Sequence, residues 1–503
     1  MKKHFFEQRR RKASSARTSP RLPRFHKGAK TQAIKSQMIY YHNIQDTRIQ
    51  QLNDFDIRLD ADYVLYWMQQ SQRAEYNHAL EYAAQQANDL GLGVVVAFGL
   101  MDDYPEANLR HYTFMLEGLT ETKALLAKRG IQMVVRRGSP PDVALELGQK
   151  AAIIVCDCGY LKPQRLWRDK VARKSACRVF QVESDVIVPL ETVSSKAEYA
   201  ARTIRPKIKN HLDDYLVELK PIKVQHSTVS ISLDGLELKR PADILALLNI
   251  DRSVPAVTRF FKGGTSRAKK IFGNFIRSRL KNYEKNHNQP QTDDISHMSM
   301  YLHFGQISPL YLALRIKKAD HRLDSAKTTF LEELIVRREL AANFVYYNRD
   351  YDNFDCLPDW ARKTLADHRK DRRPYTYTLR QLEGAKTHDP YWNAAMQEMK
   401  YTGFMHNYMR MYWGKKILEW SSSPELAFRN TLAINNKYFL DGRDPNSYAG
   451  VAWIYGVHDR AWPQRSIYGK VRCMMASGLE RKCDVHGYVD KVKKYVRKAG
   501  DTM

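Results

Sequence analysis

Between Tyr63 and Leu190 the chain alternates short apolar runs with amphipathic stretches, and this alternation constrains the fold more than any other feature. The apolar runs are YVLYWM, GVVVAFGL, IQMVVRRG, AIIVCDC and CRVFQVES, which have the length and branched side chains of buried strands. Strands in turn with helices require right-handed crossovers, which give a parallel sheet covered on both faces. The sequence therefore predicts a Rossmann-like α/β domain over residues 60–190.

The second half of the chain has a helical pattern. Residues 191–240 mix charged residues, Pro221 and the polar run HSTVSISLDG, which is typical of an interdomain linker. After it, helical periodicity predicts an all-α domain over residues 241–495. The predicted helical segments are ILALL, SRAKKIFGNFIRSRLKNYEKN, SPLYLALRIKKA, TFLEELIVRRELAANFVYY, WNAAMQEMKYTGFMHNYMRMYWGKKILEW and SPELAFRNTLAINNKYF.

The chain is strongly basic, with a net charge of +27 at pH 7. The first thirty residues hold eleven Lys or Arg against the single acid Glu7, a net +10, so the rest carries +17. This excess suits a polyanionic partner such as nucleic acid, because each neutralised phosphate releases condensed counterions. A merely cationic surface is the alternative. No apolar run reaches the eighteen residues of a membrane span, so none is predicted.

The N-terminal tail, residues 1–45, is basic and contains Ser and Pro but no apolar periodicity. It is predicted to be disordered when free. Its composition fits an organelle transit peptide, a nuclear localisation signal or an electrostatic arm for DNA, and the sequence does not rank these three.

The cysteines predict reduced thiols in an intracellular compartment, the cytoplasm or nucleoid unless the tail directs the chain to an organelle or nucleus. They are scattered and contain no Cys-x-x-Cys pair, so neither a disulfide framework nor a zinc site is predicted, and we expect no metal. The six are Cys156, Cys158, Cys177, Cys356, Cys473 and Cys483.

The predicted sheet is not expected to hold a catalytic dinucleotide. The stretch GLGVVVAFG has glycines before and after a strand, which is the wrong order for a pyrophosphate-binding turn.

Three tryptophans fall within thirty residues: Trp392, Trp413 and Trp420. The last two lie seven residues apart in the predicted helix MHNYMRMYWGKKILEW, two turns that place both indoles on one face about 10 Å apart. Because indole is easily oxidised, such a row can carry single electrons to a buried redox cofactor. The alternative is a row of core aromatics at helical spacing.

Long segments of the chain resemble the class II cyclobutane pyrimidine dimer photolyases, the light-driven flavin enzymes of DNA repair. They run in one order from about residue 60 to about residue 490, which makes the resemblance far more specific than a short motif. The segments are DYVLYWMQQSQRAEYNHALEYA, DDYPEANLRHYTFMLEGL, VCDCGYLKPQRLWR, EYAARTIRPKI, YLHFGQIS, FLEELIVRRELAANF and DGRDPNSYAGVAWIYGVHDRAWPQRSIYGK.

The resemblance implies the photolyase/cryptochrome fold and a deoxyribodipyrimidine photo-lyase activity. In this family the helical domain binds FAD, and the α/β domain holds a light-harvesting antenna chromophore, commonly a deazaflavin. The implied reaction is electron transfer from excited reduced FAD to a flipped-out dimer. The implied partner is UV-damaged DNA, single- or double-stranded, bound by a monomer.

The resemblance also assigns residues to the flavin site. The turn DDISHMSMYLHFG is similar to the phosphate-binding turn of the family, where hydroxyls and backbone amides hold phosphate. It has Met300 where the family usually has proline. Without the resemblance, its serines are interpreted as helix caps. The turn residues and the upstream tyrosine assigned to the cofactor are Tyr283, Ile295, Ser296, His297, Met298 and Ser299.

Further flavin residues come from the second half of the helical domain. Arg410 and Asp441 resemble the salt-bridged pair at the flavin ring, and Asp444 is assigned to the cofactor with them. Asn435 matches the asparagine that faces flavin N5. Arg337 is expected to touch flavin or substrate, on the same helix face as the residue four positions before it.

Glu333, four positions before Arg337, is similar to the family's carboxylic acid that hydrogen-bonds the dimer carbonyls. That role requires its protonated form and a raised pKa. The tryptophans are assigned in the order Trp413 next to flavin, Trp392 in the middle and Trp420 at the surface, for photoreduction of oxidised flavin. The residues assigned to the lesion and its flanking phosphates are Asn407, Met411, Trp453, Arg460, Trp462 and Arg472.

Two rival functions stay open. A cryptochrome-type photoreceptor shares fold, flavin and tryptophans but signals through a partner; a C-terminal regulatory extension would favour it, whereas this chain ends at Met503, after a basic helix. A basic DNA-binding protein without flavin is disfavoured by the retained pair of Arg410 and Asp441. We expect no 6-4 photoproduct repair, because His406 and His458, the nearest histidines, match no family proton donor.

Overall fold

The structure is a computed structural model that describes residues 44–500. The predicted disorder of the tail therefore falls almost entirely on residues outside the described range.

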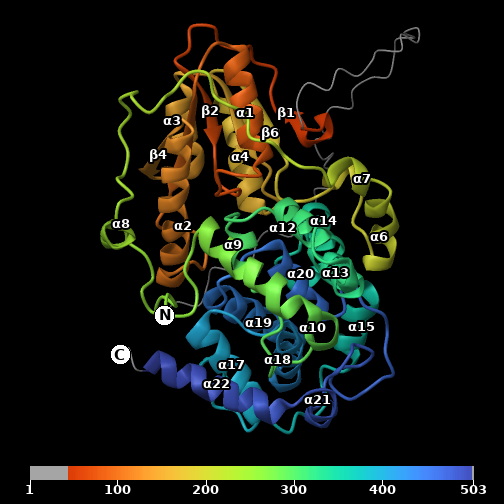
Figure 1. The fold of residues 1–503 in the computed structure, drawn as a ribbon. Coiled ribbons are helices and arrows are strands. Elements are labelled where there is room, and N and C mark those ends of the chain that lie inside the picture. The colour runs from red at the N-terminus through yellow and green to blue at the C-terminus, as the bar shows by residue number, and fades with distance from the viewer. Residues whose placement is uncertain (1–43, 501–503) are drawn as a thin grey trace, which may run out of the picture. The chain divides into compact units, whose positions relative to one another are not determined.

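A six-stranded sheet forms the core of the first half (Figure 1). Its order is β1-β6-β5-β2-β3-β4, and all neighbours are parallel except β1 and β6. This confirms the predicted parallel α/β sheet. The domain begins before the predicted residue 60, because the polar edge strand β1 gives no apolar run in the sequence. The strands are β1 (Ile49–Gln51), β2 (Tyr63–Trp67), β3 (Val94–Leu100), β4 (Gln132–Arg137), β5 (Ala151–Asp157) and β6 (Arg178–Val182).

Helices cover both faces of the sheet. Val64 and Tyr66 of β2 join one apolar core, with α1 and α2, and Leu65 joins the core of the other face, with α3 and α4. Successive strand residues alternate between faces, so a strand buried on both must be apolar throughout. The four helices are α1 (His78–Asp89), α2 (Leu109–Lys128), α3 (Pro140–Gly148) and α4 (Lys162–Lys174).

The segment predicted as a linker packs along the α/β domain instead of bridging freely. Thr228 donates to the carbonyl of Val94 at 2.6 Å, and the Leu236 amide donates to the carbonyl of Val135 at 2.7 Å. Ile244 lies in the core beneath α2, so the first domain extends past the predicted boundary at residue 241. The helices here are α5 (Leu190–Val193), α6 (Ala201–Lys209), α7 (Leu212–Tyr215) and α8 (Pro241–Leu247).

The second half is helical, as predicted, but the segment from Trp392 to Trp420 is two helices rather than one. Gly403 ends α17 with φ +74°, a left-handed conformation that glycine adopts without steric cost. The elements are α9 (Thr265–Asn274), η2 (Phe275–Arg279), α10 (Leu280–Asn286), α11 (Ser299–His303), α12 (Pro309–Lys317), η3 (His321–Leu323), α13 (Asp324–Leu331), η4 (Glu332–Arg337), α14 (Arg338–Tyr347), η5 (Phe354–Cys356), α15 (Asp359–Asp367), α16 (Leu379–Glu383), α17 (Pro390–Thr402), α18 (Asn407–Trp420), α19 (Pro424–Tyr438), α20 (Pro445–Ile454), α21 (Ala476–Lys482) and α22 (Val485–Gly500), of which η2 and η4 are π-helices.

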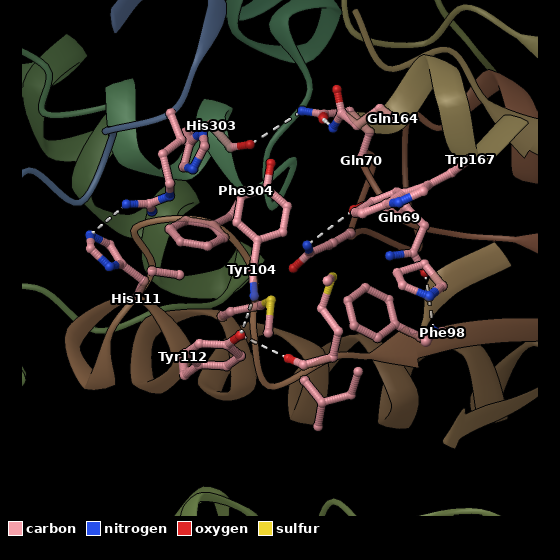
Figure 2. A pocket seen from close by; sticks show the side chains of 18 residues that line it. Gln69, Gln70, Phe98, Tyr104, His111, Tyr112, Gln164, Trp167, His303 and Phe304 are labelled. Carbon is pink, nitrogen blue, oxygen red and sulfur yellow. Dashed lines mark hydrogen bonds between the residues drawn. The ribbon is translucent and has the colours of Figure 1, made fainter. Parts of the chain in front are cut away.

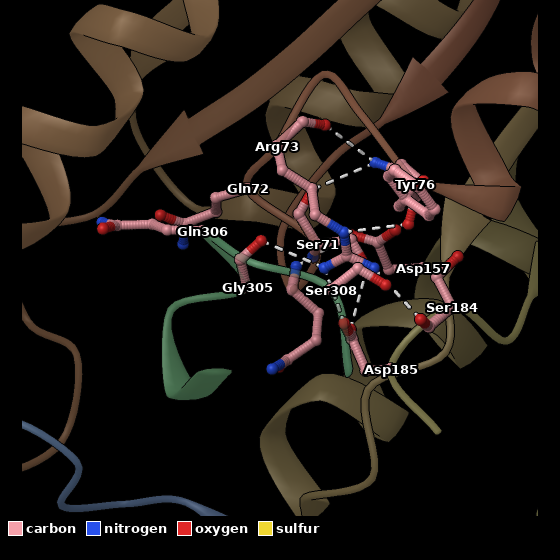
Figure 3. Close-up of polar contacts among 12 residues, drawn as sticks. Ser71, Gln72, Arg73, Tyr76, Asp157, Ser184, Asp185, Gly305, Gln306 and Ser308 are labelled. Atoms are coloured by element: carbon pink, nitrogen blue, oxygen red, sulfur yellow. Dashed lines mark hydrogen bonds and ion pairs between the residues drawn. The ribbon is translucent and has the colours of Figure 1, made fainter. Parts of the chain in front are cut away.

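A buried ion pair fixes the loop after β2 and joins it to the helical domain (Figure 3). Arg73 lies 2.8 Å from Asp185 and donates to the carbonyl of Gly305 at 3.0 Å. Asp157, at the end of β5, accepts from three backbone amides of residues 69–71. The loop is thus held at the carboxyl edge of the sheet, where ligands bind in folds of this kind.

No helix within residues 44–500 is long and apolar enough to cross a membrane.

Candidate active site

A pocket of about 200 Å³ opens in the helical domain. Its walls come from α10, α11, α13, η4, α18 and the residues around the start of α20. The side chains that line it are Tyr283, Ser296, Met298, Ser299, Leu302, Phe330, Glu333, Leu334, Arg338, Arg410, Asp441, Asp444, Asn446 and Ser447. It brings together eight residues predicted from the sequence to bind cofactor or lesion.

The turn before α11 divides into lining and supporting residues. Ser296, Met298 and Ser299 line the pocket, whereas Ile295 packs against the neighbouring core. His297 has φ +54° and places its Nε2 2.9 Å from Asp293, outside the lining. The cap position of α11 is Met298, with no side-chain cap bond, so the interpretation of the serines as helix caps is wrong.

Met300, where the resemblance expects proline, is buried in the core beneath the pocket. It is therefore part of the packing and leaves both serines of the turn at the pocket wall.

The pair of Arg410 and Asp441 is formed as predicted. One guanidinium nitrogen lies 2.9 and 3.0 Å from the two carboxylate oxygens, and Arg410 lies over the ring of Phe439 at 3.9 Å. Asp444 contacts His303 at 3.2 Å. Burial alone would raise the pKa of Asp444, but the hydrogen bond and charge of His303, the charge of Arg338 and the backbone amide of Asn446 together outweigh burial and lower the pKa. Asp444 is therefore an anionic acceptor at the pocket wall.

Asn435 lies behind the pocket rather than in its lining. Its amide donates to the Ser447 hydroxyl at 3.0 Å and to the side-chain oxygen of Asn436 at 3.1 Å. Ser447 borders the pocket, so the orientation of the Asn435 amide is fixed from the pocket wall.

Glu333 lines the pocket and is exposed toward it. Loss of hydration by the surrounding protein raises the pKa of Glu333, and the charge of Arg337 opposes this only partly. The direction is the one predicted for a carboxylic acid that donates a proton.

Arg337 does not line the pocket, and its assignment to the cofactor stays a prediction. Its guanidinium lies 5.6 Å from the ring of Trp453 and its Nε lies 3.7 Å from Glu332. The next residue, Arg338, lines the pocket instead. The sequence prediction assumed α-helical spacing, but residues 332–337 form a π-helix, which moves every following side chain around the axis.

Apart from Glu333, the residues predicted to hold the lesion lie outside the pocket lining. The guanidinium carbons of Arg460 and Arg472 lie over the ring of Trp462, at 5.3 and 5.2 Å from its centroid. Asn407 is exposed at the first turn of α18, and Met411, one turn on, is partly buried. The contacts are those of a surface that binds phosphate and stacks bases, but the lesion role stays a prediction.

The three tryptophans are in contact, but the predicted surface position of the last one is wrong. Trp392 Nε1 donates to the carbonyl of Trp413 at 2.9 Å, and the rings of Trp392 and Trp420 lie 5.6 Å apart. Trp420 is only 2% exposed, because Tyr377 and His388 pack on it at 5.4 and 5.2 Å. At the other end, Trp413 packs on Phe439, beside Arg410 of the pocket.

Neither candidate histidine lines the pocket. Burial lowers the pKa of His406 to about 3 and also lowers the pKa of His458. Both rings are therefore neutral near pH 7, as expected for structural histidines.

A second pocket of about 100 Å³ lies at the carboxyl edge of the sheet (Figure 2). Gln69 follows β2, and Phe98 lies near the carboxyl end of β3. Tyr112 comes from α2, Trp167 from α4 and His303 from α11 of the helical domain. No spacing in the sequence marks these residues, since they come from five separate elements. The only signal is the run of glutamines, MQQSQ, directly after a buried strand.

Comparison with known proteins identifies the family. The family model for DNA photolyase matches residues 64–225. A deoxyribodipyrimidine photo-lyase of Methanothermobacter thermautotrophicus is 50% identical over 451 residues, which cover 90% of this chain and 99% of the relative. The chain belongs to the photolyase/cryptochrome family. The photo-lyase of Arabidopsis thaliana is 39% identical over 444 residues, covering 86% of this chain and 89% of the relative.

Solved photolyase and cryptochrome structures share the fold. A class III photolyase from Agrobacterium tumefaciens has a TM-score of 0.63 at 17% identity and covers 89% of this chain and 91% of its own. A Synechocystis cryptochrome has a TM-score of 0.65 at 15% identity, covering 87% and 88%. The predicted fold class and the predicted enzyme class, a deoxyribodipyrimidine photo-lyase, are confirmed by these relatives.

Proteins of this family bind FAD, and the residues of the helical-domain pocket fit it. Two hydroxyls and the cation Arg338 are donors of the kind a pyrophosphate needs, and the paired Arg410 and Asp441 offer a donor and an acceptor to the flavin ring. Met298, Leu302, Phe330 and Leu334 provide apolar wall for a flat ring system. The donor set and the apolar surface therefore match the two chemical halves of the cofactor.

Proposed function

We propose that the protein repairs cyclobutane pyrimidine dimers in UV-damaged DNA under light, as a class II photolyase. One observation carries this proposal: the same pocket combines the Arg410–Asp441 pair and the two serines with Glu333, a carboxylic acid of raised pKa. A site for the cofactor alone has no use for a proton donor on its wall. DNA containing dimers, bound by a monomer, is the proposed partner.

The chemistry that bound, reduced FAD supplies under light is one-electron donation to the dimer. The chain's own residues prepare the site for it. In this proposal Ser296 and Ser299 bind the pyrophosphate and the Arg410–Asp441 pair orients the ring. Asn435 acts on N5 from behind the pocket wall, through the Ser447 hydroxyl that its amide holds. The apolar wall around Phe330 excludes water.

On the substrate side, Glu333 donates a hydrogen bond to a dimer carbonyl and so stabilises the negative charge that the dimer acquires. Trp453 and Trp462 stack against the flipped bases, and Arg460 and Arg472 bind the flanking phosphates. Net charge supports this assignment, since residues 31–503 carry +17 without the first thirty residues.

We also propose that the pocket at the sheet edge holds an antenna chromophore, of the deazaflavin type. Its aromatic side chains and glutamine amides suit a flat, polar heterocycle, and it borders His303, whose imidazole contacts Asp444 of the cofactor pocket. An absorption spectrum of the purified protein tests both cofactors: we expect flavin bands, and a separate antenna band that is lost when Trp167 is replaced by Arg. A spectrum without flavin bands would contradict the function.

The alternative function, a cryptochrome-type photoreceptor, is supported by the shared fold with the Synechocystis protein. A protein that forms a light-induced signalling complex but removes no dimers would support it.

Replacing Glu333 by Ala is expected to lower the yield of dimer splitting by about tenfold or more, because a hydrogen bond to a charged group contributes about 1.5–3 kcal/mol. Lesion affinity should change less, since stacking and phosphate contacts remain. The measurement is splitting per absorbed photon beside dimer binding. Glu333→Gln is the control: its amide donates at any pH, so it should retain more activity, and a loss equal to that of Glu333→Ala would contradict the role.

Deleting residues 1–30 is expected to weaken binding to undamaged duplex and to flatten its salt dependence, because net charge falls by 10. Binding titrations between low and high salt measure both. A full-length variant with Gln at the Lys and Arg positions of residues 1–30 should match the deletion. An unchanged salt slope would exclude the electrostatic arm and leave a targeting role.

A further inference from the structure

The π-helix η4 brings Glu332 and Arg337 to the same side of the chain. A π-helix closes its turn on the fifth residue, so the first and last of these six residues are neighbours. Glu332 Oε1 and Arg337 Nε lie 3.7 Å apart. In an α-helix the neighbour of Arg337 would be Glu333, four residues before it.

Glu332 is held from its other side by α6. Arg205 Nη2 and Nε lie 2.7 and 3.0 Å from the two oxygens of Glu332, a bidentate contact. Glu332 therefore sits between two arginines, one on each side. Arg337 in turn lies over the ring of Trp453 at 5.6 Å, and its Nε makes no hydrogen bond within the described part of the chain.

Glu333 is left without a cationic partner: none of the ion pairs among residues 44–500 includes it. The groups that act on its charge are Arg337 of η4 and His287 after α10, which attract it, and Glu332, which repels it. Tyr283 of α10 also faces it, and the charged groups that line the same pocket are Arg338, Arg410, Asp441 and Asp444. Arg337 is thus the cation whose placement matters most to Glu333.

We propose that Glu332 is a positioning residue: together with Arg205 it holds Arg337 against Trp453 and away from Glu333, so that Glu333 keeps its proton for the substrate. The part of this statement that concerns substrate rests on the proposed function. The part that concerns the proton is a property of the protein alone. Glu332 touches no reacting atom in this account and acts through Arg337.

The test is the titration of Glu333 in the purified protein, followed by the infrared band of its protonated carboxyl group, without DNA or light. Burial also raises the pKa of Glu183 to about 7 and of Glu339 to about 8, so the Glu333 band is isolated as the difference from Glu333→Gln. In Glu332→Gln the repelling charge is lost and Arg337 is free to turn to Glu333. Both changes lower the pKa of Glu333, and we expect the band to disappear at a pH lower by about 1 or more.

Three variants separate this mechanism from a structural effect. Adding Arg337→Met to Glu332→Gln should move the disappearance of the Glu333 band most of the way back to the wild-type pH, because the released cation is gone. Arg337→Met alone should move the titration to higher pH, and it tests the proposal even if Glu332→Gln does not fold. Glu425→Gln removes another arginine-paired carboxylate of the helical domain and should change nothing.

A Glu333 band that titrates at the same pH in Glu332→Gln and wild type would overturn the proposal, as would an unchanged titration in Arg337→Met. Dimer repair is measured separately against pH. As the pH rises, repair should be lost at a lower pH in Glu332→Gln than in wild type. A wild-type protein that repairs no dimers would contradict the proposed function, whereas the infrared titration would still decide the role of Glu332.

Discussion

Replacing Trp413 by Phe is expected to abolish photoreduction of oxidised FAD and to leave dimer splitting intact once FAD is reduced chemically. The reason is position: Trp413 is the tryptophan packed on Phe439, which lies beside Arg410 of the cofactor pocket. Trp392 contacts Trp413, and Trp420 contacts Trp392. Phe keeps most of the packing but is much harder to oxidise, so the electron path is interrupted at its inner end.

The measurement is the rate of flavin bleaching under blue light with an external reductant, beside repair after dithionite reduction. Trp360→Phe is the matched control, because Trp360 is a partly buried tryptophan of the same domain that takes no part in the row. Equal photoreduction by Trp413→Phe and wild type would contradict the assignment.

Replacing Arg410 by Met is expected to weaken FAD binding by about 10- to 100-fold. The substitution removes a charged hydrogen-bond donor to the flavin ring, and such a hydrogen bond contributes about 1.5–3 kcal/mol. It also leaves Asp441 at the pocket wall without its partner. Equilibrium titration of the apoprotein with FAD, read by flavin fluorescence, measures the change.

The FAD affinity of Arg410→Lys should fall between those of wild type and Arg410→Met, because lysine keeps the charge but not the planar guanidinium. Arg369→Met, which breaks an exposed ion pair with Glu425, should bind FAD like wild type. Unchanged affinity in Arg410→Met would remove this pair from the cofactor site.

The parallel sheet could be predicted because its central strands are buried on both faces, and such strands must be apolar at every position. The edge strand β1 (Ile49–Gln51) could not, since two of its three residues, Gln50 and Gln51, are polar and exposed. The prediction of a linker was wrong for a related reason. Residues 216–240 are held against the sheet by hydrogen bonds such as those from the Thr228 hydroxyl to the Val94 carbonyl and from the Leu236 amide to the Val135 carbonyl, which leave no periodic pattern.

In the helical domain the sequence pattern located the helices, but it showed neither where they are interrupted nor how deeply single side chains are buried. The pattern of apolar residues continues across Gly403, so only its backbone conformation reveals that α17 ends there. The burial of Trp420 depends on Tyr377 and His388, which precede it by more than thirty residues and carry no helical relation to it.

The candidate site shows the same limit at the level of single side chains. Arg410 and Asp441 were correctly paired because the resemblance links them, although they are 31 residues apart. Arg337 was placed on the face of Glu333 because an α-helix was assumed, and the π-helix turned it toward Glu332. A one-residue change in helical register is small in sequence terms, but it decides which arginine, Arg337 or Arg338, enters the pocket.

The central claim is tested most directly by illuminating the chemically reduced holoprotein with DNA that carries either a cyclobutane thymine dimer or a 6-4 photoproduct, and separating the products by chromatography. We predict that thymines are restored from the cyclobutane dimer and that the 6-4 photoproduct is untouched. The 6-4 lesion needs proton transfer, and neither His406 nor His458 lines the pocket or is protonated near pH 7. Persistence of the cyclobutane dimer, or loss of the 6-4 photoproduct, would contradict this account.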